Sequence, residues 1–167
     1  MGIKIITDSI CDVPKEYIGR YGIRVMPLTV HFGDESYKDG IDFSLEEFLS
    51  KLEKTKVLPT TSQVPPAEFL EVYKKEISLG NKVISIHASS HLSGTYNSAV
   101  MAKDTIGRED IYVIDSMGIT LGAGLLVIKA ARLVEEGLGF EEIAKEIEAS
   151  RNGVKHMLIL DTLKYLH

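Results

Sequence analysis

The chain of 167 residues is long enough for one domain with its own hydrophobic core and short for two. Its hydrophobic content of 44% and charged content of 26% are ordinary for a soluble globular protein. The net charge of −5, with no cluster of Lys and Arg in the sequence, argues against a nucleic-acid partner. We therefore treat residues 1–167 as one domain.

The amino terminus and the cysteine content indicate a compartment. A single cysteine, Cys11, excludes an internal disulfide and favours a reducing environment. The first residues, MGIKIITDS, lack the charged and apolar regions of a signal peptide. The longest uncharged run, residues 116–128, is shorter than the roughly 18 apolar residues that cross a bilayer. We expect a cytoplasmic protein with no stable membrane insertion.

Short apolar runs alternate with helical patterns along the chain. Apolar and β-branched runs predict strands over 3–7, 25–32, 82–87, 111–114 and the segment HMLILDTL, residues 156–163. Between them, helices are predicted up to Tyr21, over 45–53, around 69–77, over 94–105, over about 119–136 and around 140–147. This alternation predicts an α/β fold with a mainly parallel sheet and helices on both faces. The apolar strands KVISI and IYVI agree, because parallel strands are buried on both sides.

The helix over 45–53 has the most specific local signal. Ser44 and Glu47 have the spacing of a capping box, and Phe43 and Phe48 that of a hydrophobic staple. This combination predicts where the helix begins.

Small polar residues follow three of the predicted strands, at 7–9, 87–93 and 115–116. Ligands of open α/β sheets bind at the carboxyl ends of the strands. LSGT begins a helix, where backbone N–H groups lack partners and the dipole is positive. Gly94 permits close approach to the backbone, and Ser93 and Thr95 add hydroxyls, so the place suits a carboxylate or phosphate. Ser93 acting only as a helix cap explains the same residues, and both interpretations stay open.

The segment TTSQVPP presents the same choice. Thr60, Thr61 and Ser62 precede a helix that starts with proline. Their hydroxyls form either a cap or a second arm of the anion site.

Signals for catalysis or metal binding are weak. The sequence has no nucleotide-binding glycine loop and no nucleophile elbow. His87 and His91 pass from a strand into a loop, so we expect no metal. A Ser93–His87–Asp115 triad can be drawn, but nothing fixes its geometry. Cys11 is typical of a small buried residue. We expect no cofactor.

With these stretches assembled, the chain resembles the DegV family of fatty-acid-binding proteins. The matching segments occur in the family's order over nearly the whole sequence: ITDSICDVP, MPLTVHFGDESYKDGIDFS, LPTTSQVPPAEF, VISIHASSHLSGTYNSA, VIDSMGITLGAGLLV and LILDTLKYL. TTSQ and LSGTYNSA together are specific, whereas either alone is weak.

The resemblance implies an α/β protein that holds one long-chain fatty acid in an apolar tunnel. It assigns the carboxylate contacts to the Thr of TSQ and the Ser of SGT, which are Thr61 and Ser93 here. With the polar residues at the strand ends, the predicted ligand-binding set is Ser9, Thr61, Ser62, Ser93, Gly94 and Thr95. Members of the family present the acid to a fatty acid kinase and do no chemistry themselves.

The sequence departs from the family in two places. Ile10 stands where the family has a hydroxyl residue. The family continues with a Gly-Gly-Arg segment and a second α/β domain, whereas this sequence ends at His167. We expect an apolar edge there that favours a homodimer. Two alternatives remain: a subunit of a dihydroxyacetone-kinase-like enzyme that uses His87 or His91, and an interaction domain that binds no lipid.

Overall fold

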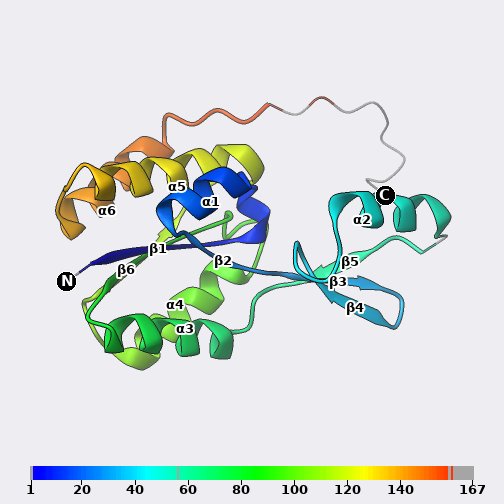
Figure 1. Cartoon of the computed structure of the whole chain (residues 1–167), viewed down its shortest axis with the longest axis horizontal. Coiled ribbons are helices and arrows are strands. Elements are labelled where there is room, and N and C mark those ends of the chain that lie inside the picture. The colour runs from blue at the N-terminus through cyan, green and yellow to red at the C-terminus, as the bar shows by residue number, and fades with distance from the viewer. Residues whose placement is uncertain (1, 56, 158, 160–167) are drawn as a thin grey trace.

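The chain forms two sheets with helices around them (Figure 1), and the computed structural model describes residues 2–55, 57–157 and 159. The larger sheet is parallel, with strand order β2-β1-β6-β7. Its strands are β1 (Ile3–Asp8), β2 (Arg24–Met26), β6 (Lys82–His87) and β7 (Ile111–Asp115). This parallel sheet confirms the predicted fold class.

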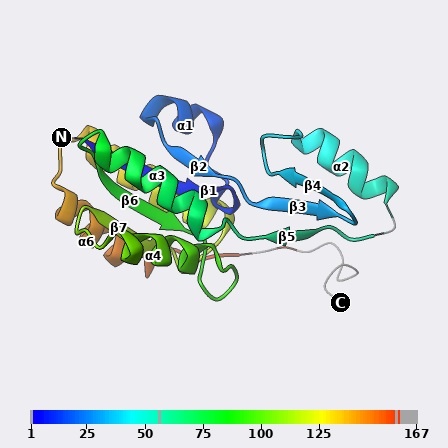
Figure 2. The same ribbon diagram turned by 90° about the horizontal axis from the view of Figure 1, so that it is seen from below.

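Helices cover both faces of the parallel sheet (Figure 1). One face carries α1 (Lys15–Tyr21), α5 (Thr120–Glu135) and α6 (Phe140–Arg151). The other carries α3 (Pro66–Ser78) and α4 (Thr95–Ile106), which lie side by side in both views (Figures 1 and 2). A short 3-10 helix, η1 (Ser9–Cys11), follows β1.

Successive residues of β6 point to opposite faces, and this alternation builds two cores. Ile84 and Ile86 pack with α5 and α6, where Phe140, Ile143, Ala144 and Ile147 are all buried, as the amphipathic pattern predicted. Val83 packs on the opposite face with Phe69 and Tyr73 of α3. Ser85 and His87 share the parity of Val83, so they also point toward α3.

The strand predicted over 25–32 is wrong as a single element. Residues 24–26 form β2 of the parallel sheet, and 29–32 form β3 (Thr29–Phe32) of a separate antiparallel sheet. Pro27 lies between them and has no N–H to donate to a continuous ladder. The antiparallel sheet has strand order β4-β3-β5 and includes β4 (Glu35–Lys38) and β5 (Thr60–Ser62). The sequence patterns did not reveal this sheet.

The helix α2 (Leu45–Lys54) lies beside the antiparallel sheet, away from the parallel one (Figure 1). Its predicted capping box is confirmed: Glu47 N donates to Ser44 Oγ at 3.2 Å, and Ser44 N donates to Glu47 Oε2 at 2.7 Å. Phe43 and Phe48 stack with ring centroids 5.7 Å apart, as the predicted staple requires. The strand predicted over 156–163 falls largely outside the described residues, which omit 158 and 160–167.

The order of the strands marks a switch point between β1 and β6. From β1 the chain crosses through α1 to β2 on one side, and from β6 it crosses through α4 to β7 on the other. Loops that leave adjacent strands in opposite directions open a crevice at the carboxyl ends, where ligands of α/β sheets bind. The residues at these ends are Asp8 and His87.

Candidate functional site

Asp8 accepts hydrogen bonds from both loops that leave the switch point. Its Oδ1 accepts from Ile10 N at 3.0 Å, and its Oδ2 accepts from Ala88 N at 3.1 Å. Oδ2 also lies 2.9 Å from His87 Nδ1, and both side chains are fully buried. One carboxylate therefore fixes the ends of β1 and β6 relative to each other.

The pair continues into the core as a chain of hydrogen bonds. Ser85 Oγ lies 2.7 Å from His87 Nε2, and the Tyr73 hydroxyl donates to Ser85 Oγ at 2.8 Å. With Tyr73 donating, the hydrogen of Ser85 is free for Nε2, which leaves the Nδ1 hydrogen for Asp8. Burial raises the pKa of the Tyr73 phenol, in keeping with its role as donor.

This constellation differs from the triad that the sequence left open. The neighbours of His87 are Asp8 and Ser85, not Asp115 and Ser93. The order Ser85–His87–Asp8 resembles that of a Ser-His-Asp triad. The side chains are buried and both nitrogens of His87 are already hydrogen-bonded, so a substrate has no access to them. Ser85 and His87 are two apart on one strand, a spacing that puts both on one face and is visible in the sequence. Tyr73 gives no comparable signal.

The two specific motifs, TTSQ and SGT, lie against each other. Gln63 Nε2 donates to Ser98 Oγ of α4 at 2.9 Å, and Val64 N donates to Thr95 Oγ1 at 3.4 Å. A Cβ added to Gly94 would meet Gln63 Oε1 at 1.7 Å, so the amide crosses directly over this glycine. Segments about 30 residues apart in the sequence thus form one local structure.

Ser93 is half-buried next to the start of α4. Its hydroxyl donates to Thr95 Oγ1 at 3.1 Å and accepts from Thr95 N at 3.3 Å. The N-cap position belongs to Gly94, which has no side chain to cap the helix. Thr95 is fully buried and its oxygen accepts from both Ser93 and Val64, so it joins β5 to α4.

Thr61 and Ser62 point to opposite faces of the antiparallel sheet, because side chains alternate along β5. Thr61 is exposed and lies opposite the buried Val30 in the register with β3. Ser62 shares the other face with His31, and its hydroxyl lies within hydrogen-bond distance of His31 Nε2. The two predicted ligand-binding residues therefore do not face the same space within their strand.

Ser9, the first residue of η1, lies beside the segment in which the chain crosses from one sheet to the other. Its hydroxyl accepts from Leu28 N at 3.2 Å, between β2 and β3. Ile10, where the resemblance led us to expect a hydroxyl residue, is half-buried and packs against the core beside α3. The side chain at position 10 therefore contributes to packing.

The loop between β7 and α5 is the third at this edge. Asp115 accepts from Met117 N at 2.8 Å and from Ser90 N at 3.2 Å, which ties the loop to the one that follows β6. Met117 and Thr120 have φ values of 56° and 51°. Positive φ is rare for a β-branched residue and is held by surrounding structure, often near functional sites. The sequence placed Asp115 at this edge and gave no sign of this backbone.

Cys11 is buried beside this site, as the sequence predicted. Burial, and secondarily the Asp8 carboxylate, raises the pKa of its thiol well above the usual range. Because the thiolate is the reactive form, a thiol reagent should leave Cys11 unmodified in the folded chain at neutral pH and label it in denaturant. The exposed variant Ser78→Cys is the control, and labelling of native Cys11 at the rate of that variant would contradict the expectation.

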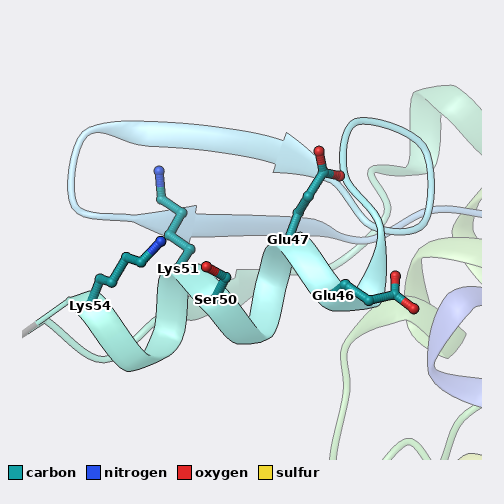
Figure 3. Close-up of a pocket in the computed structure, with 5 residues that line it drawn as sticks. All are labelled: Glu46, Glu47, Ser50, Lys51 and Lys54. Carbon is teal, nitrogen blue, oxygen red and sulfur yellow. The ribbon is translucent and has the colours of Figure 1, made fainter.

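A separate hollow of about 450 Å³ lies along α2 and is lined by five residues of that one helix (Figure 3): Glu46, Glu47, Ser50, Lys51 and Lys54. Four of the five carry a charge, but most of the lining surface is apolar, because the aliphatic stems of these side chains face the hollow. Within the described residues, no three His, Cys, Asp or Glu side chains gather as a metal site. Among the described helices, none has both the length and the apolar character to cross a membrane.

Comparison with known sequences gives matches over almost the entire chain. A family model described as "Uncharacterised protein, DegV family" matches residues 2–167. A DegV domain-containing protein of Clostridium perfringens is 48% identical over 164 residues, which cover 98% of this chain and 59% of that protein. The chain thus spans less than two thirds of the length of this relative.

Two solved structures have the same fold. DegV of Bacillus subtilis, described as a fatty acid binding protein, aligns with a TM-score of 0.85 and 37% identity over 91% of this chain and 54% of that one. A stearic acid-binding protein of Eubacterium ventriosum aligns with a TM-score of 0.81 and 32% identity over 89% of this chain and 53% of that one.

Proposed function

The chain belongs to the DegV family, as its motifs predicted, and from this we propose that it binds one long-chain fatty acid. The observation that carries the proposal is the contact between the TTSQ segment and the start of α4. That contact gathers hydroxyls and backbone N–H groups from two distant parts of the chain. Relatives about one third identical bind fatty acids, stearic acid among them.

The head group is assigned to Thr61 and Ser93, with Gly94 and the first turn of α4 beside them. Neutral hydroxyls and the positive end of a helix dipole suit a carboxylate. Thr61 is exposed and Ser93 is half-buried, so both are reachable from outside. In this proposal Ser9, Ser62 and Thr95 support the loops through the hydrogen bonds described above.

The acyl tail requires an apolar wall. Burial of each CH₂ contributes about 0.8 kcal/mol, so the tail supplies most of the affinity. Exposed apolar side chains follow β6 and β7: Leu92, Met117, Leu121 and Leu125. Exposed apolar groups of this kind are typical of a binding surface when they are contiguous. We propose that a second copy of the chain covers these side chains and completes the tunnel.

We further propose that the protein is a carrier that presents the acid to a fatty acid kinase. Accessible hydroxyls leave the carboxylate open to a partner. The enclosed His87 lends no support to a role in binding a ketone, since both its nitrogens are already engaged. The proposal assigns no catalytic residue to this chain.

Stearate binding by the purified chain tests the proposal. We expect about one fatty acid per chain after organic extraction and mass spectrometry, and saturable binding after delipidation. Thr61→Val and Ser93→Ala should each weaken binding on the order of 10-fold or more, as expected for hydrogen bonds to a charged group. Thr105→Val, at the far end of α4, is the matched control. A chain that neither contains nor binds fatty acid would contradict the proposal.

A further inference from the structure

Gln63 has a more ordered environment than an exposed glutamine normally has. It follows β5, and its amide nitrogen donates to Ser98 Oγ at 2.9 Å. Ser98 is fully buried in α4, and its own backbone N–H donates to Gly94 O at 3.0 Å. The glutamine therefore attaches the end of β5 to the first turn of α4.

Gly94 leaves the space that the Gln63 side-chain amide occupies. The backbone of Gly94 has φ −73° and ψ −4°, an ordinary conformation that any residue adopts. A Cβ there would lie 1.7 Å from Gln63 Oε1 and 2.6 Å from Gln63 Cδ. The glycine is thus required for the close approach of the glutamine and not for its own backbone geometry.

The attachment connects the two residues assigned to the head group. Thr61 lies two residues before Gln63, and Ser93 lies one residue before Gly94. The other tie, from Val64 N to Thr95 Oγ1, is longer at 3.4 Å. Gln63 therefore supplies the shorter of the two hydrogen bonds that join these segments.

We propose that Gln63 is a positioning residue that sets the separation of the Thr61 and Ser93 hydroxyls, and that it does so without contacting the ligand. The inference rests on the proposed fatty-acid site. Two hydroxyls on separate elements can hold one carboxylate only at a fixed spacing, and preorganisation of that spacing contributes affinity. Gly94 is the complementary residue, because it admits the amide to the helix start.

The variants Gln63→Ala, Ser98→Ala and the double variant test the inference. Each single change should weaken stearate binding about three- to tenfold, and the double variant should be no weaker than either single one. Gly94→Ala should match Gln63→Ala because it displaces the same amide, and the Gln63→Ala/Gly94→Ala chain should lose no more. The carboxyl resonance of [1-¹³C]stearate should shift in Gln63→Ala, a change that lower stability alone does not produce.

Ligand-free spectra separate this inference from the proposed function. In the free chain, Gln63→Ala should move the backbone amide resonances of both Thr61 and Ser93. Stearate binding that Thr61→Val weakens and Gln63→Ala leaves unchanged would overturn the positioning role alone. A parent chain that binds no stearate would overturn the proposed function. In that case the ligand-free spectra still test the positioning role. If Gln63→Ala leaves the backbone amide resonance of Ser93 unmoved, the positioning role is overturned as well, and if it moves that resonance, the role is supported.

Discussion

Replacement of Asp8 by alanine should lower the free energy of unfolding by about 3–5 kcal/mol, because it leaves three enclosed donors without an acceptor at a cost of about 1–3 kcal/mol each. The change removes the acceptor of Ile10 N, Ala88 N and the Nδ1 hydrogen of His87, all buried or partly buried. Each stranded donor then loses its partner without regaining water. Urea unfolding followed by far-ultraviolet circular dichroism measures the loss.

Two further variants make this result interpretable. Asp8→Asn keeps an oxygen for Ile10 N, so it should lower the free energy of unfolding by less, about 1–3 kcal/mol. This loss can still be measured if the alanine variant does not fold. Asp104→Ala, at an exposed position of α4, is the control and should change stability by about 0.5 kcal/mol or less. A loss below about 1 kcal/mol for Asp8→Ala would show that the network is not a main support of the fold.

The features that the sequence predicted correctly are local ones. The start of α2 follows from a capping box and a staple within six residues, and the strand 82–87 from one uninterrupted apolar run. Both signals act between near neighbours, so no knowledge of the rest of the fold is needed.

The antiparallel sheet escaped prediction because its strands have only three or four residues, and β5 is a fully exposed run of hydroxyl residues. Such a strand is defined by the partner it pairs with and not by its own pattern. Pro27 inside the apolar run 25–32 was the available sign that this run is two elements.

The candidate site was predicted as a region and not as a geometry. Parallel strands bring Asp8, His87 and Asp115 to one edge, which the sequence indicated. Which groups meet there depends on the face of the sheet to which each side chain points. Ser85 and His87 are two residues apart on β6 and point to the same face, so Ser85 and not Ser93 is the neighbour of His87. The contact of Gln63 with Gly94 depends on the packing of β5 against α4, which no local pattern encodes.

Gly124 is a second place where the close approach of two segments decides stability, and Gly124→Ala should lower the free energy of unfolding by about 1–3 kcal/mol, as overpacking does. An added Cβ would lie 2.4 Å from the carbonyl oxygen of Cys11 in η1. This neighbour is backbone, so relief requires a shift of α5 or η1 and not a rotamer change. A shift of η1 also disturbs the bond from Ile10 N to Asp8.

Gly19 in α1 is the matched control, since an added Cβ there has no neighbour within 4 Å. Gly19→Ala should raise the free energy of unfolding by roughly 0.5–1 kcal/mol, the usual gain in a helix interior. The same substitution in two helices of one chain should therefore have opposite signs in parallel urea titrations. If Gly124→Ala also stabilised the chain, α5 would not be held against η1 as closely as the structure indicates, and Cys11 and Ser9 would lose their fixed place beside the site.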